Sequence, residues 1–371
     1  MKTGLLVGTR KGIFILRADG ARTAWQVSAP HFLGHIAQHV VQDPRQPERI
    51  VAGMSTGHLG PTIFLSDDYG TTWTEASKPP AFHTGERLQR SLSSAFWLTP
   101  GHADEVGVWY AGGSPQGLFR TQDGGHSWSP VDGWNDHPSW ETWAEWPDPQ
   151  TPDGSMLHSI VIDPRDSKHM YLGLSSGGVF ETTDGGADWQ PMNAGLASPM
   201  FPDQDMEYGQ DPHCMRMHPL NPDRLYQQNH CGIYRIDRPA TRWQRIGDNM
   251  PHSIGDIGFP IELHPRDPDT AWVFPMDGTD VWPRTSPDGQ PAVYKTADGG
   301  DNWTRCDQGM PGRGWFTVKR QAMAVDAEDS IGVYFGTTSG EIWASTDEGS
   351  TWSSIAAHLP EIYSVEHATF A

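Results

Sequence analysis

An eight-residue pattern that recurs along the chain constrains its fold more than any other feature. The pattern is Ser or Thr, any residue, Asp, any residue, Gly, two further residues and Trp. It occurs at 66–73 (SDDYGTTW), 121–128 (TQDGGHSW), 182–189 (TTDGGADW), 296–303 (TADGGDNW) and 345–352 (STDEGSTW). Two degenerate copies, at 19–25 and 237–243, keep the Asp and the Trp but have one extra residue between them and no Gly at the usual position. The Trp residues that end these seven copies follow one another at intervals of 48 to 61 residues, which indicates a repeat architecture.

The chemistry of this box predicts a turn between two strands. The Asp carboxylate can accept hydrogen bonds from backbone N–H groups further along the turn, and Gly supplies a positive φ without steric cost. The Trp opens the next strand and packs into the repeat. Before each box lie two short apolar strands joined by a turn, as in HSIVIDPRDSKHMYLG at 158–173. Each repeat therefore contains four antiparallel strands, A to D, and the box is the C–D turn.

Seven such repeats predict an all-β, seven-bladed β-propeller that forms a single domain over residues 1–371. The segments 4–9 and 12–17 resemble strands B and C without a preceding strand A, whereas 363–370 resembles a strand A without partners. We expect the C-terminal strand to join the N-terminal blade and close the ring, because closure hides two sheet edges.

Composition excludes several classes of function. The formal net charge of −20 opposes nucleic acid or an anionic membrane as the main partner. No run of about 18 apolar residues is long enough to cross a membrane as a helix. The three cysteines, Cys214, Cys231 and Cys306, are too few for a disulfide framework. Together with a start that lacks the pattern of a signal peptide, they lead us to expect a cytoplasmic protein.

The boxes resemble the BNR or Asp-box repeat of sialidases, sortilin-type receptors and xyloglucanase-type glycoside hydrolases. The resemblance covers nearly the whole chain, and the segments 157–164 (LHSIVIDP) and 227–235 (QQNHCGIYR) are similar to recurrent stretches of bacterial sialidase-like proteins often named glycosyl hydrolases. It implies the propeller fold, but fold alone does not fix function. The Arg-Ile-Pro motif of sialidases is absent, and xyloglucanase-type enzymes use two propellers whereas this chain has one.

Propeller topology separates two faces. The A–B turns and the boxes lie on one face, whereas the D-to-A links and the B–C turns lie on the other, which we call the open face. Long insertions in the links at 133–156 and 197–212 belong to the open face, and long ordered loops are often functional. The first insertion carries Trp140, Trp143 and Trp146 with Glu141 and Glu145. These rings could stack on a sugar beside two carboxylates, or they could anchor the loop to the propeller.

The second insertion carries Asp203, Asp205, Glu207 and Asp211 and leads into His213. It could supply a general acid or base, for which Asp205 is our candidate, or it could be a solvated acidic loop. His158 and His213 occupy the same register on adjacent blades and are candidate catalytic groups. Arg90 and Arg320 could bind substrate on the same face.

Four histidines are candidate ligands of one divalent metal ion: His35, His158, His213 and His230. Neutral imidazoles from adjacent blades could converge at the mouth of the channel, and nearby carboxylates suit the same ion. They could equally be structural histidines held by hydrogen bonds. Deeper in the channel, we expect Arg216 and Glu262 to form an ion pair, because they share one register on adjacent blades.

Two functions fit these patterns. The first is a hydrolase or lyase that acts on a carbohydrate or another polar small molecule at the channel mouth, with or without a metal ion. The alternative is a non-catalytic scaffold that binds a protein or glycan partner through the open face. Convergence of polar groups at a concave mouth favours the enzyme.

Overall fold

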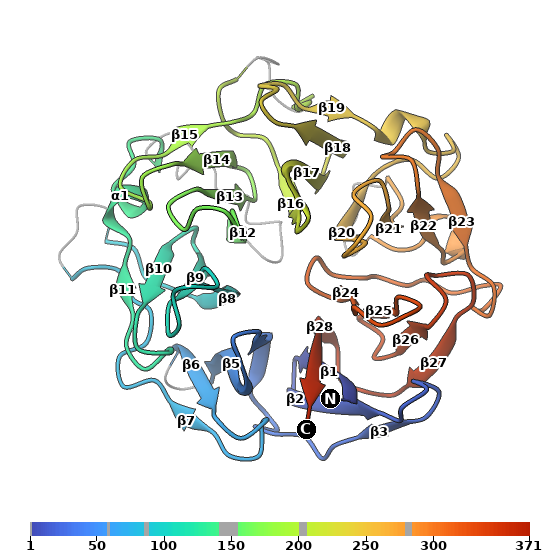
Figure 1. Cartoon of the computed structure of the whole chain (residues 1–371), viewed down its shortest axis with the longest axis horizontal. Helices are drawn as coiled ribbons and strands as arrows, with labels where there is room; N and C mark the ends of the chain where they lie inside the picture. The colour runs from blue at the N-terminus through green and yellow to red at the C-terminus, as the bar shows by residue number, and fades with distance from the viewer. Residues whose placement is uncertain (1, 58–59, 85–88, 141–154, 200–205, 279–283) are drawn as a thin grey trace.

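The structure is a computed structural model, and it describes residues 2–57, 60–84, 89–140, 155–199, 206–278 and 284–371. Seven four-stranded antiparallel sheets form a ring around a central channel (Figure 1). The predicted number of blades and of strands per blade is confirmed. Helical structure in the described residues is limited to α1 (Asp132–Asn135), η1 (Gly247–Asn249) and η2 (Pro287–Gly289). None of the helices in these ranges is long and apolar enough to cross a membrane.

Blade one combines the two ends of the chain. Its strands are β28 (Ile362–Phe370), β1 (Lys2–Thr9), β2 (Gly12–Ala18) and β3 (Trp25–Val27), in that order from the channel outwards. β28 pairs antiparallel with β1 from Lys2↔Phe370 to Thr9↔Ile362, and Figure 1 shows the two ends of the chain side by side. The predicted closure of the ring is therefore confirmed.

The other six blades follow the chain order, each with its first strand next to the channel. Blade two consists of β4 (Ile36–Asp43), β5 (Gln46–Thr56), β6 (Gly60–Ser66) and β7 (Thr74–Glu75). Blade three consists of β8 (Ser94–Pro100), β9 (Trp109–Ser114), β10 (Leu118–Thr121) and β11 (Ser129–Pro130). Blade four consists of β12 (Leu157–Ile162), β13 (Met170–Leu174), β14 (Gly178–Thr182) and β15 (Gln190–Pro191). Blade five consists of β16 (Pro212–His218), β17 (Asn221–Asn229), β18 (Gly232–Asp237) and β19 (Gln244–Arg245). Blade six consists of β20 (Gly258–Leu263), β21 (Ala271–Pro275), β22 (Val293–Thr296) and β23 (Thr304–Cys306). Blade seven consists of β24 (Met323–Val325), β25 (Val333–Gly336), β26 (Ile342–Ser345) and β27 (Ser353–Ala356).

The box at 66–73 shows how the repeated residues stabilise the turn. Ser66 Oγ donates to Asp68 Oδ1 at 2.8 Å and accepts the Gly70 N–H at 2.8 Å. Asp68 Oδ1 also accepts the Thr72 N–H at 2.8 Å, and the Trp73 indole donates to the Gly70 carbonyl. Gly70 has a φ of 84°, which favours glycine at this position. The same Ser/Thr–Asp and Ser/Thr–Gly hydrogen bonds recur in the other four complete boxes, at 121–128, 182–189, 296–303 and 345–352.

Each complete box is also tied to the A–B side of its own blade. A backbone N–H of the box donates to a carbonyl at or beside the A–B turn: that of Glu48, Gly107, Lys168, Asp269 or Ile331. The boxes and the A–B turns therefore share one face, as the repeat predicts. The D-to-A links and the B–C turns form the opposite, open face.

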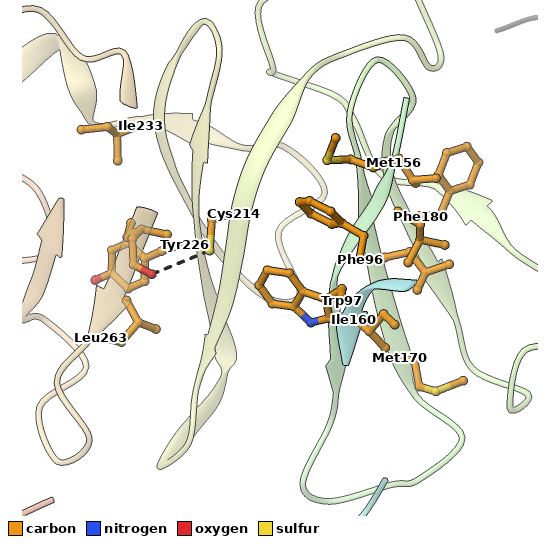
Figure 2. Packing of buried hydrophobic residues seen from close by; sticks show 14 of the residues in the cluster. Phe96, Trp97, Met156, Ile160, Met170, Phe180, Cys214, Tyr226, Ile233 and Leu263 are labelled. Carbon is orange, nitrogen blue, oxygen red and sulfur yellow. Dashed lines mark hydrogen bonds between the residues drawn. The ribbon is translucent and has the colours of Figure 1, made fainter. Parts of the chain in front are cut away.

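Apolar side chains between neighbouring blades form the core. Figure 2 shows part of one cluster that runs across several blades, with Trp97 from β8, Ile160 from β12, Cys214 from β16 and Leu263 from β20. All four side chains are at least nine-tenths buried. This packing holds the inner strands in register, so that groups at the ends of adjacent strands occupy fixed positions around the channel.

Candidate functional site

Three polar residues of blade five meet on the open face. Asp211 precedes β16, His213 lies within it, and His230 lies in the turn between β17 and β18. The register pairs Pro212 with Asn229, which places Asp211 opposite His230, and the His230 N–H donates to the Asp211 carbonyl at 2.9 Å. The register of β16 shifts between Pro212 and Cys214, so His213 lies in an irregularity of the strand, and its ring comes within 3.4 Å of the Asp211 carboxylate.

Both neighbouring blades orient these side chains. The Ser176 N–H of blade four donates to Asp211 Oδ1 at 3.0 Å, which turns Oδ2 towards the two imidazoles. Asp211 Oδ2 lies 3.4 Å from His213 Nε2 and 3.5 Å from His230 Nδ1. His213 Nδ1 lies 2.6 Å from the Gly258 carbonyl of blade six. Because a carbonyl only accepts, Nδ1 of His213 carries a proton, and the Nε2 atom of the same ring faces Asp211 Oδ2.

The surrounding charges keep Asp211 ionised. Burial alone would raise its pKa, but the nearby His213, His230 and Arg320 side chains hold the pKa of Asp211 well below its usual range. A carboxylate in this state can accept a proton, bind a cation or stabilise positive charge, but it cannot serve as the proton donor at neutral pH.

His158 lies beside this group and is fully buried. The Ser159 hydroxyl accepts the Met215 N–H at 2.9 Å and lies 2.9 Å from His158 Nδ1, to which it can donate. That arrangement leaves the proton of neutral His158 on Nε2. Burial, followed by the charge of Arg320, lowers the pKa of His158 well below its ordinary value, so the ring stays neutral. Ser159 has a φ of 53°, an uncommon backbone conformation for a residue other than glycine.

Two arginines border the site. Arg320 is largely buried in the channel, where its Nη1 contacts Met156 and Ser175 and its guanidinium lies 5.4 Å from the centre of the Phe259 ring. Arg284 Nη2 lies 3.4 Å from His230 Nε2. Among the described residues, the mouth therefore combines the ionised carboxylate of Asp211 with several imidazoles and with the guanidinium groups of Arg284 and Arg320.

A cavity of about 500 Å³ opens next to His230, between blades five and six. Its lining includes His230, Cys231, Arg245, Asp256 and Arg284. Arg245 and Asp256 form an ion pair at 2.8 Å. The volume falls within the range of small-molecule sites, and the charged lining suits a polar ligand.

The structure brings together part of the predicted metal-ligand set. Among the described residues, His213 and His230 join Asp211 in a group whose ligand atoms all lie within 4.8 Å of one another. His158 and His35 do not belong to that group. His158 is oriented by Ser159, and His35 precedes β4, where its N–H donates to the Phe32 carbonyl. Sequence reasoning placed Asp211 only within an acidic loop, although its position two residues before His213 was the signal that could have identified it.

The structure buries Trp140, the candidate of the first insertion for stacking on a substrate. Trp140 is 2% exposed, its indole donates to the Trp134 carbonyl, and its ring packs against Phe82. Arg90 lies over the Phe82 and Trp140 rings, 4.4 Å and 4.3 Å from their centres. Trp140 thus anchors this part of the chain, which was the alternative interpretation for the Trp residues, and Arg90 packs against its ring. The other candidates of the two insertions lie outside the described residues: Glu141, Trp143, Glu145, Trp146 and Asp205.

The expected ion pair deeper in the channel is confirmed. Arg216 Nη2 and Nε lie 2.5 Å and 3.1 Å from Glu262 Oε1, and the guanidinium is 5.2 Å from the centre of the Trp97 ring. A cavity of about 410 Å³ surrounds the pair, with His39 and Glu366 in its wall. His39 and Glu366 are 2.8 Å apart, so the acidic groups here already have partners.

Comparison with known proteins points to carbohydrate-active relatives. No protein-family model matches the chain, and its resemblance to the BNR repeat stays a prediction. The chain is 24% identical to a probable oligoxyloglucan-reducing end-specific xyloglucanase from Neosartorya fischeri, in a match that covers 87% of this chain and 39% of the fungal protein. It thus spans about two fifths of the length of that curated relative.

Solved structures support the fold. An ancestral enzyme of glycoside hydrolase family GH74 superposes with a TM-score of 0.58 at 16% identity, over 90% of this chain and 39% of that one. The periplasmic gluconolactonase PpgL of Pseudomonas aeruginosa superposes with a TM-score of 0.60 at 13% identity, over 100% of both chains. At these identities the similarity shows the propeller fold alone.

Proposed function

We propose that this protein is a carbohydrate-directed hydrolase whose site lies on the open face, at the channel mouth beside Asp211. The observation that carries the proposal is the sequence similarity to a xyloglucanase over 87% of the chain. The ionised Asp211 and the adjacent cavity supply a chemical group and a space that suit a polar substrate.

Hydrolysis of a glycosidic bond usually requires two carboxyl groups, one protonated and one ionised. Asp211 fits the ionised role, as a base that activates water or as a group that stabilises positive charge on the sugar ring. Glu141, Glu145 and Asp205 stay the candidates for the proton donor. The proposed hydrolysis does not depend on a metal ion, because two carboxyl groups can catalyse it by acid–base chemistry alone.

The test is a screen of the purified full chain against xyloglucan oligosaccharides and other soluble glycans, with new reducing ends as the readout. Asp211→Asn keeps the size of the side chain but removes its charge, and we expect it to lower kcat at least about 100-fold. His83→Ala is the matched control, since His83 forms an exposed pair with Asp132 on the same face. Absence of hydrolysis by the unmodified protein, or full activity of Asp211→Asn, would reject the proposed site and favour a glycan- or protein-binding scaffold.

A further inference from the structure

We propose that Asp211, His213 and His230 form a binding site for one divalent transition-metal ion of the zinc type. The site goes beyond the proposed hydrolase activity, because an ion here could be bound with or without glycan hydrolysis. Its ligand set replaces the four histidines expected from the sequence.

The separations between the ligand atoms match such an ion. Bonds of about 2.0–2.1 Å at tetrahedral angles place neighbouring ligand atoms about 3.4 Å apart. Asp211 Oδ2 lies 3.4 Å from His213 Nε2 and 3.5 Å from His230 Nδ1. The three residues offer ligand atoms that all lie within 4.8 Å of one another.

The surroundings fix the ligands as metal sites do. A ligating histidine typically donates its other ring N–H to a carbonyl or carboxylate, and His213 Nδ1 faces the Gly258 carbonyl in this way. The second oxygen of Asp211 is held by the Ser176 N–H. Two of the three ligands are therefore oriented before any ion binds, and each is oriented by a different neighbouring blade.

The donor types select the class of ion. Two imidazole nitrogens and one carboxylate oxygen suit zinc and its neighbours, whereas calcium and magnesium prefer oxygen ligands throughout. Three protein ligands leave a fourth position for water or a substrate oxygen, as in catalytic zinc sites. The cavity beside His230 gives that position access to small molecules.

Two features of the site weaken the binding of the ion and therefore limit its affinity. The guanidinium groups of Arg284 and Arg320 add positive charge near the site, and the proposed ligand set contains a single carboxylate, that of Asp211. Arg284 Nη2 approaches His230 Nε2, so the proton of neutral His230 sits on Nδ1 in the ion-free state and must be displaced when the ion binds. We therefore expect weaker binding than at a site built from thiolates.

Cys231 offers the main competing ligand, since it lines the same cavity. Burial raises the pKa of its thiol to about 11, so the thiol is protonated at neutral pH. Because Cys231 lines the same cavity as His230, the experiment includes a Cys231 variant that tests whether this thiol contributes to metal binding.

The experiment is a zinc titration of chelator-treated full chain by calorimetry, with metal content measured after dialysis. We expect one ion per chain for the unmodified protein and for the controls His83→Ala and Cys231→Ser. Asp211→Asn and His230→Gln should each weaken binding at least 10-fold. Both replacements are close in size to the original side chain, and circular dichroism will confirm that the variants are folded.

Cobalt provides a second readout that does not depend on activity. Cobalt bound at the proposed site should give visible absorption bands of a tetrahedral complex, and Asp211→Asn should lose them. Absence of stoichiometric binding would overturn the proposal, as would binding that survives Asp211→Asn but is lost in Cys231→Ser. Failure of the glycan screen would leave the metal result unaffected, so the two proposals fail separately.

Discussion

Replacement of Arg216 by Met should destabilise the propeller by leaving Glu262 without its partner. The side chains of Arg216 and Glu262 are only 21% and 11% exposed, and two nitrogens of Arg216 contact one oxygen of Glu262. Removal of one member of a buried ion pair costs about 3–5 kcal/mol. Because this pair keeps some contact with the channel, we expect about 3 kcal/mol for Arg216→Met.

A double-mutant cycle separates the ion pair from simple loss of packing. Glu262→Gln removes the unpaired charge, so the double variant should be more stable than the sum of the single effects predicts, by about 2 kcal/mol. Urea unfolding followed by tryptophan fluorescence measures each free energy of unfolding. Arg49→Met is the matched control: Arg49 pairs at 2.7 Å with Asp67, which is 59% exposed, and surface pairs contribute about 0–1 kcal/mol. Equal losses for Arg216→Met and Arg49→Met, or no coupling with Glu262, would refute the reasoning.

Three further predictions concern the boxes, the closure and the anchored insertion. Partial burial would raise the pKa of Asp123, but hydrogen bonds from Ser127 and Thr121 outweigh it and lower that pKa to about 2. The contribution of Asp123 to stability is therefore complete above about pH 4 and is lost as the pH falls towards 2. In acid titrations monitored by circular dichroism, the unmodified protein should lose more stability than Asp123→Asn over that interval. Phe370→Ala removes a ring that is 3% exposed in β28 and should cost about 3–5 kcal/mol in urea unfolding, and a loss below about 1 kcal/mol would argue against a closure maintained by this strand. Trp140→Ala should also cost about 3–5 kcal/mol, because the ring is buried against Arg90; an unchanged stability with weakened glycan binding would restore the stacking hypothesis.

The sequence by itself determined the architecture. Five complete boxes and two degenerate ones specify seven hairpins, because every copy keeps the Asp and the Trp and the five complete copies also contain the Gly that the turn requires. The incomplete strand sets at the two ends predicted that β28 would pair with β1, since only closure satisfies both edges. The pairing of Arg216 with Glu262 followed from the same register argument.

Only the tertiary structure decided how the open face is built. Asp211 became part of the site because the register of β16 and β17 places it opposite His230, and because Ser176 of one neighbouring blade and Gly258 of the other orient Asp211 and His213. Trp140 is an anchor because Phe82 and Arg90, which lie 58 and 50 residues earlier in the chain, pack against its ring. Local hydrogen bonds within a repeat can be recognised from residue types, whereas contacts between loops of different blades depend on side-chain packing that no short sequence pattern encodes.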